Sequence, residues 1–427
     1  MTTAPHDPAD LPALTVRTVP LAGAPDLIAR LGPAAPMAWL RRGEGLVGWG
    51  EAARLEFPAE SAPEGTGRFA GAARALDALR ARARVLDEVG APGTGPVAFG
   101  GFTFDPRSGG SVLVVPRVVV GYRGGRAWVT TAARGGEEQP AEAPDAIAEG
   151  PPPAPVGPLD WQAGSLSAGE WGAAVGRAVE RIRGAELDKV VMARDVIARA
   201  RAPIDVRTLL GRLARSYPDC YTFSVAGMVG ATPELLLRRE GDEVESLVLA
   251  GTRPRAADPG EDARLGRELQ ESAKDREEHR YAIDSLRATL APLCASVEAP
   301  ERPRLLRLAN VQHLASPARA RLLPGASTLD AVAALHPTAA VGGSPTGAAM
   351  RMIRELEGMD RSRYAGPVGW IDGDGNGEWG IALRCALVEG ARARLFAGCG
   401  IVAGSEPAAE VAESESKLQV MRAALTD

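Results

Sequence analysis

The stretch Leu187-Asp-Lys-Val-Val-Met-Ala-Arg194 has the composition of a buried strand with a charged side chain near its start. Valine favours an extended chain, and alternate side chains of a strand point to opposite faces. Lys189 therefore shares a face with Val191. If that face is the interior of the protein, the ammonium group of Lys189 is partly desolvated, which favours the neutral amine.

The scarcity of lysine gives this position more weight. Of 49 basic residues only three are lysine, namely Lys189, Lys274 and Lys417, and every other one is arginine. A general bias toward arginine would leave lysine where an ammonium group is specifically needed, as a titratable base or a compact point charge. The alternative is that the three are chance survivors on the surface. Composition alone leaves both explanations open.

The overall composition predicts a globular protein with a small ligand. Hydrophobic residues form 45% and charged residues 24% of a chain of 427 residues, which is long enough for a large buried core. A net charge of -5 argues against a nucleic-acid partner, because phosphate-binding surfaces carry a basic excess. Neither residues 1–10 nor the apolar run 112–120 has the pattern of a signal or membrane-spanning segment, so we expect a cytoplasmic protein without membrane contacts. The cysteines lack the spacing of a zinc site or a disulfide framework, and we expect buried thiols at Cys220, Cys294, Cys385 and Cys399.

Turn-rich stretches divide the chain into two parts. Residues 1–12 are predicted to form a disordered tail, and the stretch 134–158, rich in Gly, Glu, Ala and Pro, a surface linker. The N-terminal part, 13–158, contains no catalytic motif, and its predicted elements are a helix at 69–89 and strands at 96–104 and 111–122. The second part, 159–427, holds all the motifs that could carry chemistry.

Strands and helices are both predicted in the second part. Ser167 and Glu170 have the spacing of a capping box, at the start of a helix that ends near Gly184. Glu234 lies at the entry of one of the predicted strands, which are 221–229, 235–239 and 246–250. The segment from 262 to 293 has the pattern of one long helix, and a final helix follows Ser405-Glu-Pro407.

Both of these last helices carry acidic groups on one face. Asp275, Glu278 and His279 project from the same side of the long helix, and Glu410, Glu413 and Lys417 share a face of the final one. The ordinary explanation is a solvated helix surface. The glycine-rich stretch 372–377 is predicted to be a hairpin turn, because Leu383 occupies the position of the glutamate of a calcium loop. The stretch 396–401 is predicted to be a strand whose backbone closely approaches a ligand or another strand.

Taken together and in order, the motifs resemble the chorismate-binding enzymes: isochorismate synthases, salicylate synthases, and the large subunits of anthranilate and aminodeoxychorismate synthases. The resemblance covers about residues 160–426, and so many blocks in one order are highly specific. The blocks are Leu187-Asp-Lys-Val-Val-Met-Ala-Arg194, Ala231-Thr-Pro-Glu-Leu-Leu236, Leu249-Ala-Gly-Thr-Arg-Pro-Arg255, Ser272-Ala-Lys-Asp-Arg-Glu-Glu-His279, Val311-Gln-His-Leu314, His336-Pro-Thr338, Tyr364-Ala-Gly-Pro-Val-Gly369, Ile381-Ala-Leu-Arg384 and Ala397-Gly-Cys-Gly-Ile401. The resemblance implies an α+β fold with two large, mainly antiparallel sheets packed face to face and helices outside. It also implies that the N-terminal part contributes strands to the same assembly.

The reaction implied by the resemblance converts chorismate to isochorismate, with addition of water at C2 and loss of the C4 hydroxyl. By resemblance, Lys189 is the base that deprotonates the water, and Glu234 is the acid that protonates the departing hydroxyl. An apolar pocket could keep the Glu234 carboxyl protonated, and only a protonated carboxyl can donate.

A magnesium ion is part of the same implied site. Glu278 and Glu413 match the positions of its ligands, with Glu410 and Asp275 expected in the outer shell or bound through water. Arg384 is expected to bind the second carboxylate of the substrate. The other positions expected to bind the substrate are Gly251, Thr252, His313, Ala340, Tyr364, Gly398, Gly400 and Lys417.

Two features favour isochorismate synthase within the family. Amine-using relatives typically have glutamine at the position of Lys189, and the sequence holds no amidotransferase segment, so we expect water as the nucleophile and no amidotransferase subunit. Salicylate-forming relatives usually carry Thr-Ala at the position of Ala340-Val341, where isochorismate synthases typically have Ala-Leu. Salicylate synthase remains an alternative, and so does a catalytically silent homologue that serves as a binding subunit, which would be expected to lose Lys189, Glu234 or a metal ligand. We expect a monomer that acts in siderophore or menaquinone biosynthesis.

Overall fold

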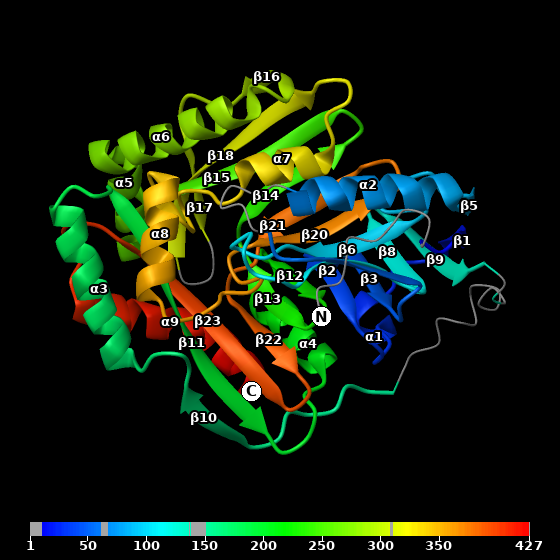
Figure 1. Ribbon diagram of the computed structural model, residues 1–427, viewed down its shortest axis with the longest axis horizontal. Helices are drawn as coiled ribbons and strands as arrows, with labels where there is room; N and C mark the ends of the chain where they lie inside the picture. Colours follow the sequence, from blue (N-terminus) through cyan, green and yellow to red (C-terminus); the bar gives the residue numbers. More distant parts are fainter. Residues whose placement is uncertain (1–10, 61–66, 136, 138–150, 308–310, 427) are drawn as a thin grey trace.

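The computed structural model describes residues 11–60, 67–135, 137, 151–307 and 311–426, and its strands form two large sheets (Figure 1). Neighbouring strands are antiparallel throughout the described residues, except for the parallel pair β1 and β5. The predicted class, α+β with two large and mainly antiparallel sheets, is confirmed.

The first sheet has 13 strands. Their order across the sheet is β10 (Leu159–Ala163), β11 (Lys189–Ala200), β23 (Arg392–Ile401), β22 (Cys385–Glu389), β13 (Met228–Thr232), β12 (Tyr221–Val225), β2 (Met37–Arg41), β3 (Glu44–Trp49), β8 (Val118–Arg123), β9 (Arg126–Arg134), β1 (Leu14–Leu21) and β5 (Arg84–Asp87), with β19 (Gly343–Ser344) paired to β11. At the end of this sheet, all four residues of β5 are exposed.

The second sheet has 10 strands. Their order is β16 (Cys294–Glu298), β18 (Val311–Leu322), β15 (Glu243–Pro254), β14 (Leu235–Glu240), β21 (Gly377–Ile381), β20 (Pro367–Asp372), β6 (Val97–Gly101), β7 (Ser111–Val115) and β4 (Ala53–Phe57), with β17 (Arg304–Arg307) paired to β18.

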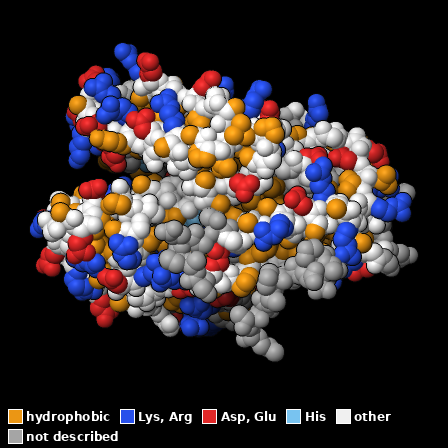
Figure 2. Space-filling model, turned by 45° about the horizontal axis from the view of Figure 1, so that its top comes forward, with side chains coloured by type: hydrophobic (Ala, Val, Ile, Leu, Met, Phe, Trp, Pro, Cys, Tyr) orange, Lys and Arg blue, Asp and Glu red, His pale blue; other side chains and the backbone are white. Residues whose placement is uncertain are grey.

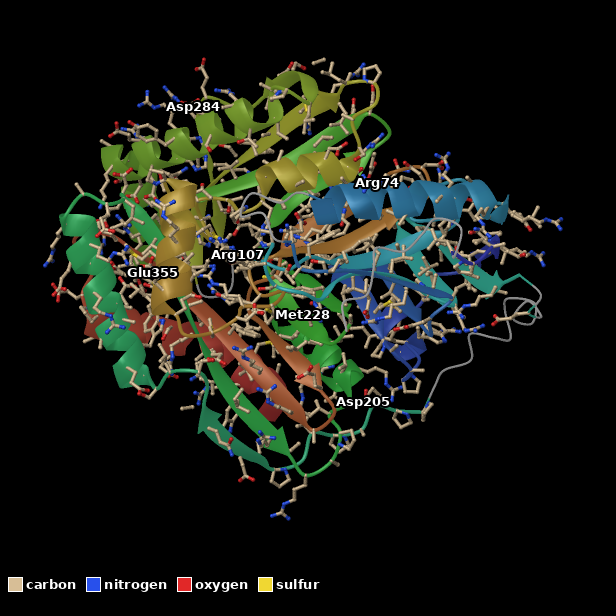
Figure 3. The ribbon with its side chains drawn as sticks, viewed as in Figure 1. Arg74, Arg107, Asp205, Met228, Asp284 and Glu355 are labelled. Atoms are coloured by element: carbon tan, nitrogen blue, oxygen red, sulfur yellow. The ribbon has the colours of Figure 1, made fainter. Side chains whose placement is uncertain are left out.

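Helices cover the outer faces of both sheets. They are α1 (Leu27–Arg30), α2 (Gly67–Arg82), α3 (Ala168–Arg183), α4 (Val206–Ser216), α5 (Pro259–Glu271), α6 (Ala273–Leu290), α7 (Thr328–Leu335), α8 (Thr346–Leu356) and α9 (Pro407–Thr426). In Figure 1 α5 and α6 lie over β15 and β18, whereas α4 and α9 lie behind the first sheet. Arg74 on α2 and Asp284 on α6 project from the outer sides of these helices (Figure 3). No helix within the described residues is long and apolar enough to cross a membrane.

The main hydrophobic core lies between the two sheets. Trp39 on β2 is almost fully buried there, and its indole donates to the Glu378 carboxylate of β21 at 2.6 Å. The next residue, Trp379, is also almost fully buried but points to the opposite face of the second sheet. A second apolar cluster fills the space between the first sheet and the helices α1, α4 and α9. The strands that bound the site are therefore held from both faces.

The N-terminal strands belong to both sheets. In the first sheet β2 pairs with β12, and in the second β6 pairs with β20. Of the predicted linker, residues 136 and 138–150 lie outside the described residues, and 151–158 have no regular secondary structure. The predicted disordered tail also lies outside them except for its last two residues, of which Leu11 is buried.

Several predicted elements have different bounds in the structure. The single helix predicted from 262 to 293 is wrong: it is two helices, because Ser272 has an extended ψ of 114° and caps the second one. The helix predicted at 69–89 ends at Arg82, and the following residues pair with β1 as β5. The strand predicted at 221–229 is the hairpin β12–β13, and the strand predicted at 111–122 divides into β7 and β8, which belong to different sheets. The capping box of Ser167 and Glu170 is confirmed, and so is the hairpin turn at 372–377.

Candidate active site

Lys189 lies where β11 and β23 run side by side. Val191 of β11 is opposite Gly400 of β23, so the side chain of Lys189 passes over the glycine. A Cβ atom on Gly400 would stand 3.0 Å from Lys189 Cε and 3.6 Å from Nζ. The absence of a side chain at Gly400 therefore leaves room for the ammonium group of Lys189.

Glu234 lies where the chain crosses from one sheet to the other. It follows the end of β13 and directly precedes β14, and its backbone N–H donates to Thr232 Oγ1 at 3.3 Å. Burial raises the pKa of the Glu234 carboxyl to about 7, against the opposing effect of the positive charges on Arg384 and Lys189. Near neutral pH a large fraction of this carboxyl is protonated and able to donate a proton. Lys189 and Arg384 therefore each lie within electrostatic range of the Glu234 carboxyl.

Arg384 follows β21 with a left-handed backbone, at φ 48°. This conformation directs its carbonyl to β13, where it accepts from the Ala231 N–H at 3.2 Å. The side chain is half-buried, and within the described residues its guanidinium group makes no ion pair. A half-buried guanidinium without a carboxylate partner is suited to bind one from a ligand.

Thr252 and His313 face the same region from the second sheet. They are opposite each other on β15 and β18, beside a bulge at Gly251, whose φ is +78°. Thr252 Oγ1 and His313 Nδ1 are 2.9 Å apart. Burial and the nearby charge of Arg384 lower the pKa of His313 to about 4, so its imidazole is neutral at pH 7.

Gly398, Tyr364 and Lys417 form the next part of the site. A Cβ atom on Gly398 would stand 2.9 Å from the Tyr364 hydroxyl, whose ring stacks on Phe396 with centroids 5.1 Å apart. Lys417 Nζ donates to the Gly398 carbonyl at 2.7 Å and pairs with the Glu413 carboxylate at 2.6 Å. Burial raises the pKa of Tyr364, so its hydroxyl stays protonated.

Glu410 and Glu413 form an acidic pair on α9. One ligand atom of each lies within 4.8 Å of the other and of Cys399 Sγ. Burial raises the pKa of Glu410, and the Glu413 carboxylate adds to that shift. Burial also raises the pKa of the Cys399 thiol to about 12, so it stays protonated and is a poor ligand for a hard cation. The donor set of two carboxylates fits magnesium.

Two further predicted site residues are exposed. Glu278 is exposed on α6 and does not belong to the cluster of Cys399, Glu410 and Glu413. Ala340 is exposed in the turn between α7 and β19, next to the buried Val341. The Val191 N–H of β11 donates to the Gly342 carbonyl at 2.9 Å, so this turn is held beside the strand that carries Lys189.

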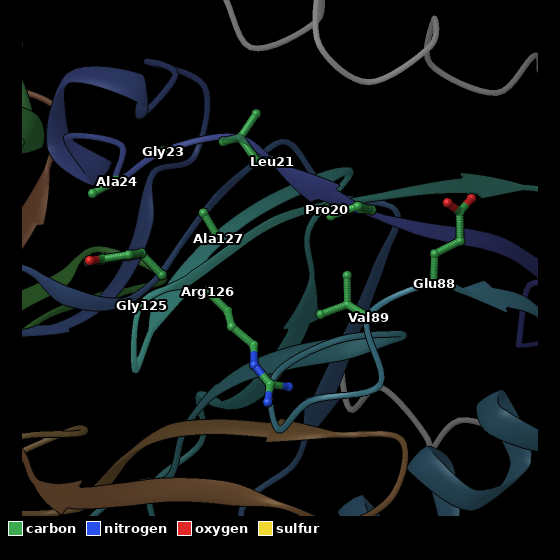
Figure 4. Close-up of a pocket in the computed structure, with 10 residues that line it drawn as sticks. Pro20, Leu21, Gly23, Ala24, Glu88, Val89, Gly125, Arg126 and Ala127 are labelled. Atoms are coloured by element: carbon green, nitrogen blue, oxygen red, sulfur yellow. The ribbon is translucent and has the colours of Figure 1, made fainter.

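A pocket of about 250 Å³ adjoins the site, and Arg384, His313 and Pro233 are among its lining residues. The face drawn in Figure 2 is hollowed by a groove on its left side. A more open pocket of about 560 Å³ lies at the far end of the first sheet, where Pro20, Val89 and Arg126 face it (Figure 4). None of the predicted site residues lines that pocket, so volume alone does not locate the site.

Sequence reasoning missed one buried ion pair near the site, between Glu357 and Arg361. Their side chains are only 0% and 2% exposed. A Glu and an Arg four residues apart are the commonest kind of helix-surface pair, so the spacing carries no sign of burial. The one feature of the sequence that could have drawn attention to this pair is its position just before Tyr364, which begins one of the quoted blocks.

Residues 39–426 match the family model described as chorismate binding enzyme. The chain therefore belongs to the chorismate-binding enzyme family.

Two curated relatives are isochorismate synthases by name. The chain is 45% identical over 279 residues to the salicylate biosynthesis isochorismate synthase of Pseudomonas aeruginosa, a match that covers 64% of this chain and 58% of that protein. It is 40% identical over 264 residues to the isochorismate synthase MenF of Bacillus subtilis, with 61% and 56% covered. The chain thus matches less than two thirds of the length of either relative.

Solved structures match over a larger share. The menaquinone-specific isochorismate synthase MenF of Escherichia coli aligns with a TM-score of 0.79 and 25% identity, over 97% of this chain and 95% of that one. Anthranilate synthase component I of Streptococcus pneumoniae aligns with a TM-score of 0.68, over 88% and 91%, and at 21% identity this shows a shared fold alone.

Proposed function

We propose that the protein is an isochorismate synthase, which converts chorismate to isochorismate. The observation that carries the proposal is the buried Glu234 carboxyl, whose pKa is raised to about 7 and which lies within electrostatic range of Lys189. A base and a neutral acid in one site are what exchange of a hydroxyl between two carbons requires. The names of the relatives support the same activity.

In this reaction Lys189 accepts a proton from water as the water oxygen bonds to C2 of the substrate. Both double bonds of the ring diene shift and the C4–oxygen bond breaks, while Glu234 gives its proton to the departing hydroxyl, which leaves as water. One water enters and one leaves, so substrate and product are isomers. Proton exchange with solvent then removes the proton that Lys189 gained and returns the one that Glu234 lost, which resets the site.

The two carboxylates of chorismate would be bound by different groups. Arg384 would pair with one, assisted by the Tyr364 hydroxyl and the backbone around Gly398 and Gly400. Glu410 and Glu413 would hold a magnesium ion, which supplies positive charge for the other carboxylate when bound, and Glu278, which stands outside their cluster in this structure, is the proposed third ligand. Gly251, Thr252, His313 and Ala340 would line the ring, and Lys417 would lie toward the carboxylate end.

Lysine at position 189 favours water over ammonia as the nucleophile, so the enzyme would act without an amidotransferase subunit, and we propose that it is a monomer. Ala340 is small and Val341 is a branched apolar residue, and this combination is typical of enzymes that stop at isochorismate. Elimination of pyruvate to give salicylate is the competing outcome.

The proposal is tested by incubation of the purified protein with chorismate, with and without magnesium, and separation of the products by chromatography. Isochorismate without pyruvate is expected, and both a chelator and Lys189→Ala should abolish it. Formation of salicylate and pyruvate would instead assign the protein to the salicylate synthases, which act as lyases. A protein that binds chorismate without turnover would be a silent homologue.

A further inference from the structure

Among the described residues, strand β11 has no neighbouring strand along part of the edge opposite β23. On that edge β19 pairs only with Lys189 and Val190, and β10 pairs only from Val196 onward. Between them the Val191 N–H donates to the Gly342 carbonyl, whereas side chains bind the Val191 carbonyl and both backbone groups of Ala193. The Trp171 indole donates to the Ala193 carbonyl at 2.8 Å, and the Ala193 N–H donates to the Glu357 carboxylate at 2.7 Å.

Arg361 completes this set of side-chain contacts. Its guanidinium group donates to the Val191 carbonyl at 2.6 Å and to the Val341 carbonyl at 2.9 Å. It also forms an ion pair with Glu357, with Nε 2.9 Å from Oε2, and it lies 4.1 Å from the centre of the Phe104 ring. One guanidinium group thus binds two carbonyls from separate segments, the strand β11 and the turn 338–342.

These two segments carry residues of the proposed reaction. Lys189 is two positions from Val191 and on the same face of the strand, and Ala340 directly precedes Val341. A displacement of either carbonyl would change the distance between the base and the wall of the ring site. Buried ion pairs contribute little net stability, because desolvation offsets their attraction. We therefore attribute to the pair of Glu357 and Arg361 a role in positioning the backbone.

We propose that Glu357 and Arg361 are positioning residues, which hold the strand of Lys189 in register with the turn that carries Ala340. The proposal rests on the proposed function, in which Lys189 is the base. Neither residue touches the reacting atoms. They act through the backbone groups of Val191, Ala193 and Val341.

The test replaces both charges together, with Glu357→Met and Arg361→Met in one protein, so that no unpaired charge is left buried. The expected result is a folded enzyme whose KM for chorismate changes less than about threefold, while kcat falls about 10- to 100-fold through misplacement of the base. A second variant, Arg361→Lys, keeps the charge but cannot reach both carbonyls and Glu357 together, and a smaller fall in kcat is expected.

A spectroscopic readout follows Lys189 independently of turnover. The chain has only three lysines, so reductive methylation with a ¹³C label gives three side-chain signals, which lysine variants assign. In the double Met variant the Lys189 signal should shift or broaden, while those of Lys274 and Lys417 stay in place. The matched control removes another Arg–carboxylate pair with Arg354→Met and Asp105→Met. Arg354 lies on α8, and among the described residues neither side chain makes a hydrogen bond or ion pair with β11. This control should leave kcat within about twofold and the Lys189 signal unmoved.

The outcomes separate the two proposals. An unchanged Lys189 signal with unchanged kcat in the double Met variant would overturn the positioning role, and so would a rise in KM at constant kcat. If the double variant does not fold, the kcat and Lys189 signal of Arg361→Lys decide in the same way. A wild-type protein that does not convert chorismate would refute the proposed function, and the Lys189 signal would still report whether the pair holds the strand.

Discussion

Glu234 is a carboxyl group on which two opposing effects act. Loss of water on burial favours its neutral form, and the positive charges of Arg384 and Lys189 favour its ionised form. Burial prevails, and the pKa of about 7 lies close to neutral pH, where an acid catalyst is most effective. The sequence placed this residue at the entry of a predicted strand and the resemblance to the family gave its role, but the size of the shift depends on charges that come from β11 and from the connection between β21 and β22.

We expect a pH dependence that follows from this raised pKa. The acid must carry its proton, so kcat/KM for chorismate should fall as pH rises through about 7, by about tenfold for each further unit. Glu234→Gln should remove this alkaline limb and lower kcat by about 10²- to 10⁴-fold, because an amide cannot deliver a proton. The measurement is a pH–rate profile of both proteins. A wild-type rate that stays constant from pH 6 to 9 would show that Glu234 is not the acid.

Gly400 gives a second prediction for a single residue. In Gly400→Ala the new methyl group would meet Lys189 Cε at 3.0 Å, and the flexible lysine would move aside. We expect kcat to fall about tenfold or more, with little loss of stability, because a shift of the base of about 1 Å is costly to catalysis. Steady-state kinetics and thermal unfolding check this. Gly404→Ala is the matched control, since a Cβ atom there would meet nothing within 4 Å.

For helices and strands, the sequence predicts the type of an element better than the residues at which it begins and ends. Between 262 and 293, apolar residues at helical spacing lie on both sides of an almost wholly polar stretch at 270–280, which contains no Gly or Pro to mark a break, so the pattern alone predicts one helix there. The break depends on a backbone angle and a capping hydrogen bond, from the Asp275 N–H to Ser272 Oγ at 3.2 Å. The division of 111–122 between two sheets was equally hidden, because Pro116 interrupts the strand without showing where each half pairs.

Ser272 tests the start of α6, the helix of Glu278. Ser272→Ala removes the side-chain cap, which should destabilise the first turn by about 1 kcal/mol. Amide hydrogen exchange in that turn, at Asp275 above all, should quicken about fivefold, while amides in β11 keep their protection. Exchange that is unchanged at Asp275 would mean that other contacts hold the turn.

In the whole molecule, the two parts of the chain that composition suggests do not correspond to the two sheets. The N-terminal strands pair with strands of the second part in both sheets, through β2–β12 and β6–β20. Such pairings join residues more than 180 positions apart, and no local pattern encodes them. The resemblance to the family predicted the shared assembly, whereas periodicity and composition did not.

Fragments of the chain should therefore depend on each other. Residues 158–427 alone would leave β12 and β20 without their partners and the core between the sheets open, so we expect no cooperative thermal transition. Co-expression with residues 1–157 as a separate chain should restore a folded complex, because the contacts do not require the covalent link. Calorimetry and co-purification measure both outcomes. Independent folding of the larger fragment would contradict this account.

The strand β5 has a consequence for the molecule in concentrated solution. Its outer edge has no partner strand among the described residues, and Val85 and Leu86 are 42% and 61% exposed. An open edge with apolar side chains is a template for aggregation, and short length and flanking charge are the usual protection. Here that protection is a strand of four residues that begins with Arg84 and ends with Asp87. The solubility of the protein thus depends in part on two charged side chains far from its chemistry.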